Sequence, residues 1–110
     1  MAIKVIPTID FIKELKQISK KHKGILSDIA ILSEQLKDNP TIGTNLGQNV
    51  YKIRLAISGT NKGKSGGARV ITYVVIISET VYLSEIYLKS EHDTADADMV
   101  IQRLKDSGLI

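Results

Sequence analysis

Positively charged side chains gather in one part of this sequence, where acidic residues are absent. No aspartate or glutamate lies between Asp38 and Glu79. The cationic residues in that stretch are Lys52, Arg54, Lys62, Lys64 and Arg69. A long stretch without acids concentrates positive potential, which favours an anionic partner such as a phosphate backbone. The pattern predicts a nucleic-acid-binding surface, while a segment rich in buried strand remains the plainer interpretation.

Alternation of apolar and polar residues predicts how two of these cations are placed. From Val50 onward the pattern has a period of two, which is typical of a strand. One face of this strand carries Tyr51, Ile53, Leu55 and Ile57. Lys52 and Arg54 share the other face, roughly 7 Å apart at about 3.3 Å per residue. We expect helices to cover the apolar face and to leave the two cations on the open one.

Cations gathered on a sheet face can bind a phosphodiester and stabilise charge on its transition state. RNA carries its own nucleophile, the 2′-hydroxyl, so such a cluster needs no metal, cysteine or cofactor to act as a ribonuclease. The candidate residues are Lys52, Arg54, Lys64, Arg69 and Lys89. The same cluster would also suit a phosphate-binding surface without chemistry, and composition does not separate the two.

Other chemistries have less support in the sequence. There is no cysteine, which excludes a disulfide framework, a thiol nucleophile and thiolate metal sites. His22 and His92 show no spacing typical of metal ligands, so no metal is expected. A segment starting at Gly59 resembles a phosphate-binding P-loop. However, three residues instead of four separate Gly59 from the Gly63-Lys64 pair. A β-branched strand also follows, where a P-loop requires a helix.

Length and hydropathy indicate a single cytoplasmic domain over residues 1–110. The hydrophobic content of 43% is sufficient for one core. The N-terminal residues lack the apolar region and cleavage site of a signal peptide. The longest apolar run, Val74 to Ile77, is too short to cross a bilayer.

The first half of the chain is expected to form a strand and two helices. A strand over residues 2–7 precedes a helix that Thr8 caps. Gly24 is expected to supply the left-handed residue that ends this helix. A second helix begins at Ile25 and stops before Pro40, because proline cannot continue a helix.

The second half is expected to form a meander and a third helix. Residues 41–49 are predicted to be a loop. Strands are expected over 50–57, 68–77 and 81–88, and their short connections imply antiparallel pairing. A final helix is expected from about 94 to 107. The fold class is therefore α+β.

Three segments together resemble toxins of the RelE/ParE superfamily, which belong to type II toxin–antitoxin systems, and most of all their HigB-like branch. They are Tyr51-Lys-Ile-Arg-Leu55, Asn61-Lys-Gly-Lys-Ser-Gly-Gly-Ala-Arg-Val-Ile71 and Ile86-Tyr-Leu-Lys-Ser-Glu91. The match covers residues 50–93, whereas the first half agrees only in its strand–helix–helix order. The combination is fairly specific, although no single segment is.

The resemblance implies a RelE-like fold and ribosome-dependent cleavage of mRNA in the ribosomal A site. It also implies neutralisation by a cognate antitoxin, often a helix-turn-helix protein that covers the basic face. Lys52 and Arg54 match the family's paired cations, and Arg69 matches the arginine that opens the next strand. The loop residue Lys64 joins this catalytic set, and Lys62 and Lys89 are expected to bind RNA.

One departure from the family leaves the general acid and base open. RelE-type enzymes place a functional tyrosine in their C-terminal segment, and no tyrosine follows Tyr87 here. The candidates are Tyr87, Lys52, Glu91 and His92. Two alternatives to cleavage also remain: inhibition of gyrase by protein binding, as in the ParE branch, or a RelE-fold nucleic-acid-binding protein that does not cleave.

Overall fold

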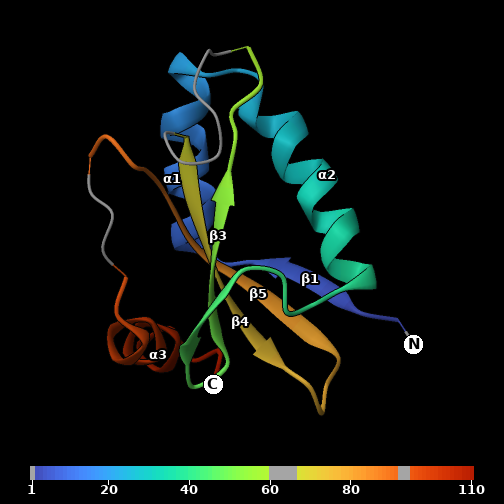
Figure 1. Ribbon diagram of the computed structural model, residues 1–110. Coiled ribbons are helices and arrows are strands. Elements are labelled where there is room, and N and C mark those ends of the chain that lie inside the picture. The colour runs from blue at the N-terminus through green and yellow to red at the C-terminus, as the bar shows by residue number, and fades with distance from the viewer. Residues whose placement is uncertain (1, 60–66, 92–94) are drawn as a thin grey trace.

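The computed structural model describes residues 2–59, 67–91 and 95–110 (Figure 1). The elements follow one another as β1 (Lys4–Pro7), α1 (Ile9–Lys21), α2 (Ile25–Asp38), β2 (Thr44–Gly47), β3 (Val50–Leu55), β4 (Ala68–Val75), β5 (Thr80–Leu88) and α3 (Ala97–Asp106). No helix in the described ranges is long and apolar enough to cross a membrane.

The strands form one sheet in the order β1-β5-β4-β3-β2. β1 runs parallel to β5, and the other neighbouring strands are antiparallel. The expected meander is confirmed as β3, β4 and β5, and the α+β class is confirmed with it. The expected final helix is also present, although it begins at Ala97 after an Asp96 cap.

Different helices cover the two faces of this sheet. α1 and α2 contribute Phe11 and Leu36 to the larger core, where each is at most 1% exposed. α3 contributes Val100 and Leu104 to a smaller core on the opposite face. Figure 1 shows α3 well apart from the other two helices. The strand residues buried in the smaller core are Val50, Ile71 and Tyr87.

Residues 41–49 are not only a loop, which corrects the sequence-based prediction. β2 pairs with β3, with Thr44 opposite Lys52 and Asn45 opposite Tyr51. Gln48 and Asn49, at the turn, both have positive φ angles of 53° and 65°. Positive φ at both central residues is typical of tight hairpins, where Asn-Gly is the common sequence signal. Gln-Asn lacks that signal, so the sequence did not reveal the hairpin.

Gly24 has a different role from the one its type suggested. α1 ends at Lys21 with His22 as its C-cap, and Gly24 is the N-cap of α2 with φ −62°, so Gly24 is not left-handed. A Cβ atom on Gly24 would lie 2.5 Å from the backbone oxygen of Ser58. Glycine is therefore required because two backbones approach closely.

β4 is shorter than expected because it ends at Val75. Ile76 and Ile77, which the prediction placed in the strand, lie in the turn and are 73% and 99% exposed. Glu79 completes this turn with φ 52°. β-branched residues favour strands intrinsically, but position at a turn overrides that preference.

An extra residue in β5 changes which of its side chains face α3. Glu85 pairs with Ile71 and Leu83 pairs with Thr72, so the pairing skips Ser84. In a regular strand Leu83 and Glu85 would share a face. Here Leu83 packs into the larger core, while Glu85 lies opposite Ile71 of the smaller core. This β-bulge therefore directs Glu85 and Tyr87 to the α3 face.

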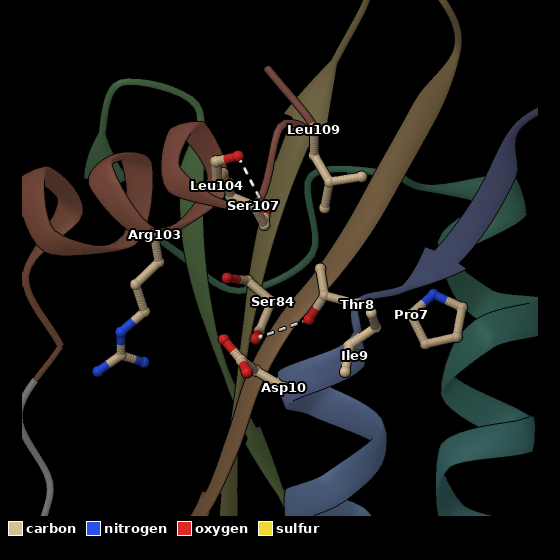
Figure 2. A pocket seen from close by; sticks show the side chains of 9 residues that line it. All are labelled: Pro7, Thr8, Ile9, Asp10, Ser84, Arg103, Leu104, Ser107 and Leu109. Atoms are coloured by element: carbon tan, nitrogen blue, oxygen red, sulfur yellow. Dashed lines mark hydrogen bonds between the residues drawn. The ribbon is translucent and has the colours of Figure 1, made fainter.

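Thr8 joins the bulge to the start of α1. Its hydroxyl donates to the Ser84 carbonyl at 3.2 Å, a bond drawn in Figure 2, and accepts from the Phe11 amide at 3.2 Å. Its own amide donates to the Leu83 carbonyl at 3.0 Å. The predicted cap of α1 is confirmed, and the same residue satisfies the carbonyl that the bulge exposes.

Candidate nucleic-acid interface

Lys52, Arg54 and Arg69 lie on the same face of the sheet. Val50 packs into the smaller core, and residues two and four positions further along the strand share its face. Lys52 and Arg54 are therefore on the α3 side. Arg69 is directly paired with Arg54, and directly paired residues project to one face. The structure thus brings the three cations together, while their part in catalysis stays a prediction.

Three side chains form a row across β3, β4 and β5, which we call the arginine row. Arg54 lies opposite Arg69, and Arg69 lies opposite Tyr87. Directly paired side chains have Cβ atoms roughly 4.5–5.5 Å apart, and like charges so placed are destabilising. The register therefore starts the two arginine side chains next to each other on the α3 face.

The cations differ in their access to solvent. Arg54 is exposed, Lys52 is half-buried, and Arg69 is only 1% exposed. The Nη1 atom of Arg69 donates to the carbonyl of Ala68 at 3.2 Å. Arg54 is therefore the arginine that is open to a ligand. Arg69 lies beneath the surface, where its charge adds to the positive potential around Arg54.

The remaining predicted residues are placed less uniformly. Tyr87 belongs to the arginine row, but it is 4% exposed and packs in the smaller core. Lys89 and Glu91 are exposed just beyond β5. The amide of Lys89 donates to the Gly67 carbonyl at 3.0 Å, which ties this segment to the start of β4. Lys62, Lys64 and His92 lie outside the described residues.

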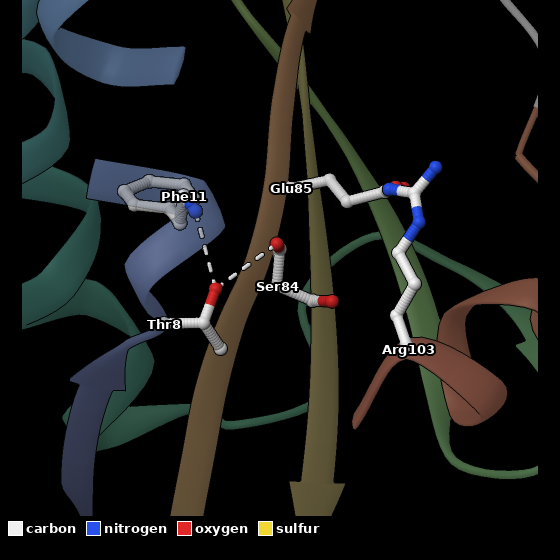
Figure 3. A network of polar contacts seen from close by, with 5 residues as sticks. All are labelled: Thr8, Phe11, Ser84, Glu85 and Arg103. Atoms are coloured by element: carbon white, nitrogen blue, oxygen red, sulfur yellow. Dashed lines mark hydrogen bonds and ion pairs between the residues drawn. The ribbon is translucent and has the colours of Figure 1, made fainter. Parts of the chain in front are cut away.

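Sequence reasoning missed an ion pair on this face. Glu85 from β5 binds Arg103 from α3 (Figure 3). The Glu85 side chain is 12% exposed and that of Arg103 is 47% exposed. The pair connects α3 to the sheet beside the arginine row. A signal existed in the spacing of Leu83 and Ile86, whose three-residue separation indicates a break in the alternation.

A separate cavity lies where β1, α1 and α3 meet (Figure 2). Its volume is about 290 Å³, and its walls include Ile9, Leu104 and Leu109. Ser84 and Arg103 also border it, but no residue of the sequence-predicted site does. In the described ranges, no three histidine, cysteine or acidic residues gather as metal ligands would.

The sheet order and the placement of the helices define an α+β protein of the RelE-like fold. The structure is similar to a solved structure of the E. coli toxin RelE, a double arginine-to-alanine mutant in the free state. The TM-score is 0.66, the sequences are 16% identical, and the match covers 94% of this chain and 99% of the other. No protein-family model matches this sequence, and neither does any curated protein.

Proposed function

We propose that this chain is the toxin of a type II toxin–antitoxin pair and cleaves mRNA on the ribosome. The RelE-like fold supports the toxin class, since the similarity to E. coli RelE extends over 94% of the chain. The observation that carries the RNA target is the arginine row with Lys52 beside it. Lys52 and Arg54 reach solvent on the face where Arg54 and Arg69 are directly opposed.

The proposed reaction uses the nucleophile that RNA itself supplies. Arg54 and Lys64 bind the scissile phosphate, and Arg69 adds positive charge from below. Lys52 assists removal of the proton from the 2′-hydroxyl, whose oxygen attacks the phosphorus. The bond from phosphorus to the 5′-oxygen breaks, and that oxygen takes up a proton. The products are a 2′,3′-cyclic phosphate and a 5′-hydroxyl end.

The partners follow from the same proposal. Lys62 and Lys89 extend the RNA-binding surface, and the ribosome presents the message in its A site. A cognate antitoxin, of the helix-turn-helix kind expected for the HigB-like branch, neutralises the toxin by covering the basic face. The proposed location is the cytoplasm, where translating ribosomes are found.

Purified protein incubated with translating ribosomes tests the proposal. We expect truncated mRNA with 5′-hydroxyl and cyclic phosphate ends. The Lys52→Ala variant should lose most of this cleavage. Lys16→Ala, which removes an exposed lysine from α1, is the matched control and should cleave normally. Intact message at a large excess of protein would contradict the proposal. Inhibition of gyrase supercoiling in a parallel assay would instead assign a protein target.

A second candidate is an RNA-binding protein of the same fold that does not cleave. The burial of Tyr87 favours it, because a hydroxyl enclosed in the smaller core is poorly placed to exchange protons with a substrate. Retained binding of a short oligoribonucleotide, together with intact mRNA in the ribosome assay, would select this candidate.

A further inference from the structure

A groove lies between α2 and the edge of β3 that faces away from β4, and Arg54 of the arginine row borders it. One wall is formed by Ile31, Leu32 and Gln35 of α2, and the other by residues 53–56 of β3 and its extension. We call it the β3–α2 groove. Its volume is about 250 Å³. Pockets for drug-sized ligands occupy about 300–1,000 Å³, so this groove suits a smaller group such as one ring system.

The backbone of β3 is open along this groove. Pairing with β2 ends at Lys52, whose carbonyl lies 2.5 Å from the position of a Cβ on Gly43 and so points away from β4. The carbonyl of Leu55 points the other way, toward Gly67 of the β4 side. Backbone groups alternate in direction along a strand. The N–H and C=O of Arg54 therefore face the groove.

These two backbone groups lie beyond the end of the hairpin ladder. Within the described ranges, β2 supplies no partner opposite Arg54, and no turn or loop backbone bonds to it. An N–H and a C=O side by side form a donor–acceptor pair. The hydrogen-bonding edges of nucleobases carry the complementary arrangement.

The opposite wall is apolar and carries little free charge. Ile31 borders the groove and is 58% exposed, and Leu32 and Ile42 also line it. Asp28 also borders the groove, but its carboxylate accepts hydrogen bonds from both the amide and the hydroxyl of Ser58. Arg54 borders the groove with its backbone, while its exposed, positively charged side chain projects to the α3 side of the same strand.

We propose that the β3–α2 groove binds one nucleobase, belonging to the nucleotide whose phosphate Arg54 holds. The Arg54 side chain binds the phosphate, the exposed Ile31 side chain contacts the face of the base, and the Arg54 backbone hydrogen-bonds to the edge of the base. Gln35, which also lines the groove, adds an amide that can donate and accept hydrogen bonds. This inference rests on the proposed RNA target and adds a subsite that selects among nucleotides.

Titration of the isotope-labelled full chain with mononucleotides tests the subsite. AMP, GMP, CMP and UMP are added separately, and inorganic phosphate is the reference for phosphate binding alone. At least one nucleotide should shift the amide signal of Ala56 and the methyl signals of Ile31, in addition to signals of the arginine row. Phosphate should shift only signals around the arginine row. Identical shift patterns for nucleotides and phosphate would overturn the proposal.

Two variants of α2 provide a matched comparison. Ile31 and Leu26 are 58% and 53% exposed, but only Ile31 borders the groove. Ile31→Ala should weaken nucleotide binding about fivefold through lost apolar contact, and phosphate binding should not change. Leu26→Ala should leave both affinities unchanged. Equal nucleotide affinities for the two variants would contradict the proposal that the base binds in the groove.

The open edge of β3 also offers a place for an extended peptide. A hexapeptide of alternating valine and glutamate is the probe for this occupant. Shifts of the groove signals with the peptide, and none with any nucleotide, would assign the groove to a peptide and overturn the proposal. Nucleotide-induced shifts without mRNA cleavage would support the nucleobase subsite and contradict only the proposed cleavage activity. Cleavage of mRNA without nucleotide-induced shifts would contradict only the proposed subsite.

Discussion

The face of the sheet under α1 and α2 and the face under α3 differ in how far their apolar cover extends. The larger core buries residues from both helices and from β3, β4 and β5. The smaller core ends within the sheet, because Val50 is buried while Lys52 and Arg54, on the same strand and face, reach solvent. The larger core therefore holds the fold together, and the uncovered part of the other face is available for binding.

The largest expected effect lies in the larger core. Leu36 is fully buried there, so Leu36→Ala should lower the free energy of unfolding by about 3–5 kcal/mol through lost contact and a residual cavity. Urea denaturation followed by circular dichroism measures this change. If Leu36→Ala lowered the free energy of unfolding by less than Leu104→Ala does in the smaller core, the larger core would not be the main source of stability.

Leu104→Ala is that corresponding substitution. Leu104 is 2% exposed and packs in the smaller core. We expect a loss of about 2–3 kcal/mol, because a small core at the end of the chain can partly close around the gap. The same denaturation experiment applies. A loss larger than that of Leu36→Ala would show that α3 contributes more to stability than its few buried contacts suggest.

Thr8 tests the connection between α1 and the bulge. Thr8→Ala removes the acceptor for the Phe11 amide and the donor to the Ser84 carbonyl, which should cost about 1–2 kcal/mol. Thr8→Ser keeps the hydroxyl and should recover most of that stability. Thermal unfolding of both variants gives the comparison. Equal destabilisation by serine and alanine would assign the effect to the lost methyl group.

Arg54→Ala should have the smallest effect on stability and a large one on binding. Because Arg54 is exposed and opposes another cation, its loss should change the unfolding free energy by less than about 0.5 kcal/mol. Affinity for a short oligoribonucleotide should fall about tenfold with the loss of a charge-assisted hydrogen bond. Fluorescence anisotropy at two salt concentrations measures both affinity and salt dependence. Unchanged affinity would indicate that RNA does not bind at the arginine row.

The sequence revealed the parts of the site that depend on local periodicity. The alternation from Tyr51 to Ile57 predicted which side of β3 carries Lys52 and Arg54, since strand geometry has a fixed period. The α+β class and the cap at Thr8 followed from equally local signals. These features depend only on residues that are neighbours in the sequence, so a single sequence is sufficient to predict them.

The parts that the sequence did not reveal depend on contacts between distant segments. The spacing of Leu83 and Ile86 indicates a break in the alternation of β5, but only the pairing of β5 with β4 shows that the bulge at Ser84 brings Glu85 to Arg103. The burial of Arg69 depends on packing around the sheet rather than on its own residue type. The requirement for Gly24 comes from Ser58, far along the chain. No spacing rule within one element contains this information.

The unpaired edge of β3 also has a consequence for handling the protein in concentrated solution. Strands with free backbone groups can template pairing between molecules, and charged side chains on such edges suppress it. We expect the positive charges of Arg54, at the open part of this edge, and of Lys52, where the pairing with β2 ends, to suppress such pairing. Substituting both by alanine should promote aggregation at high protein concentration, most of all in high salt, where the remaining charges are screened.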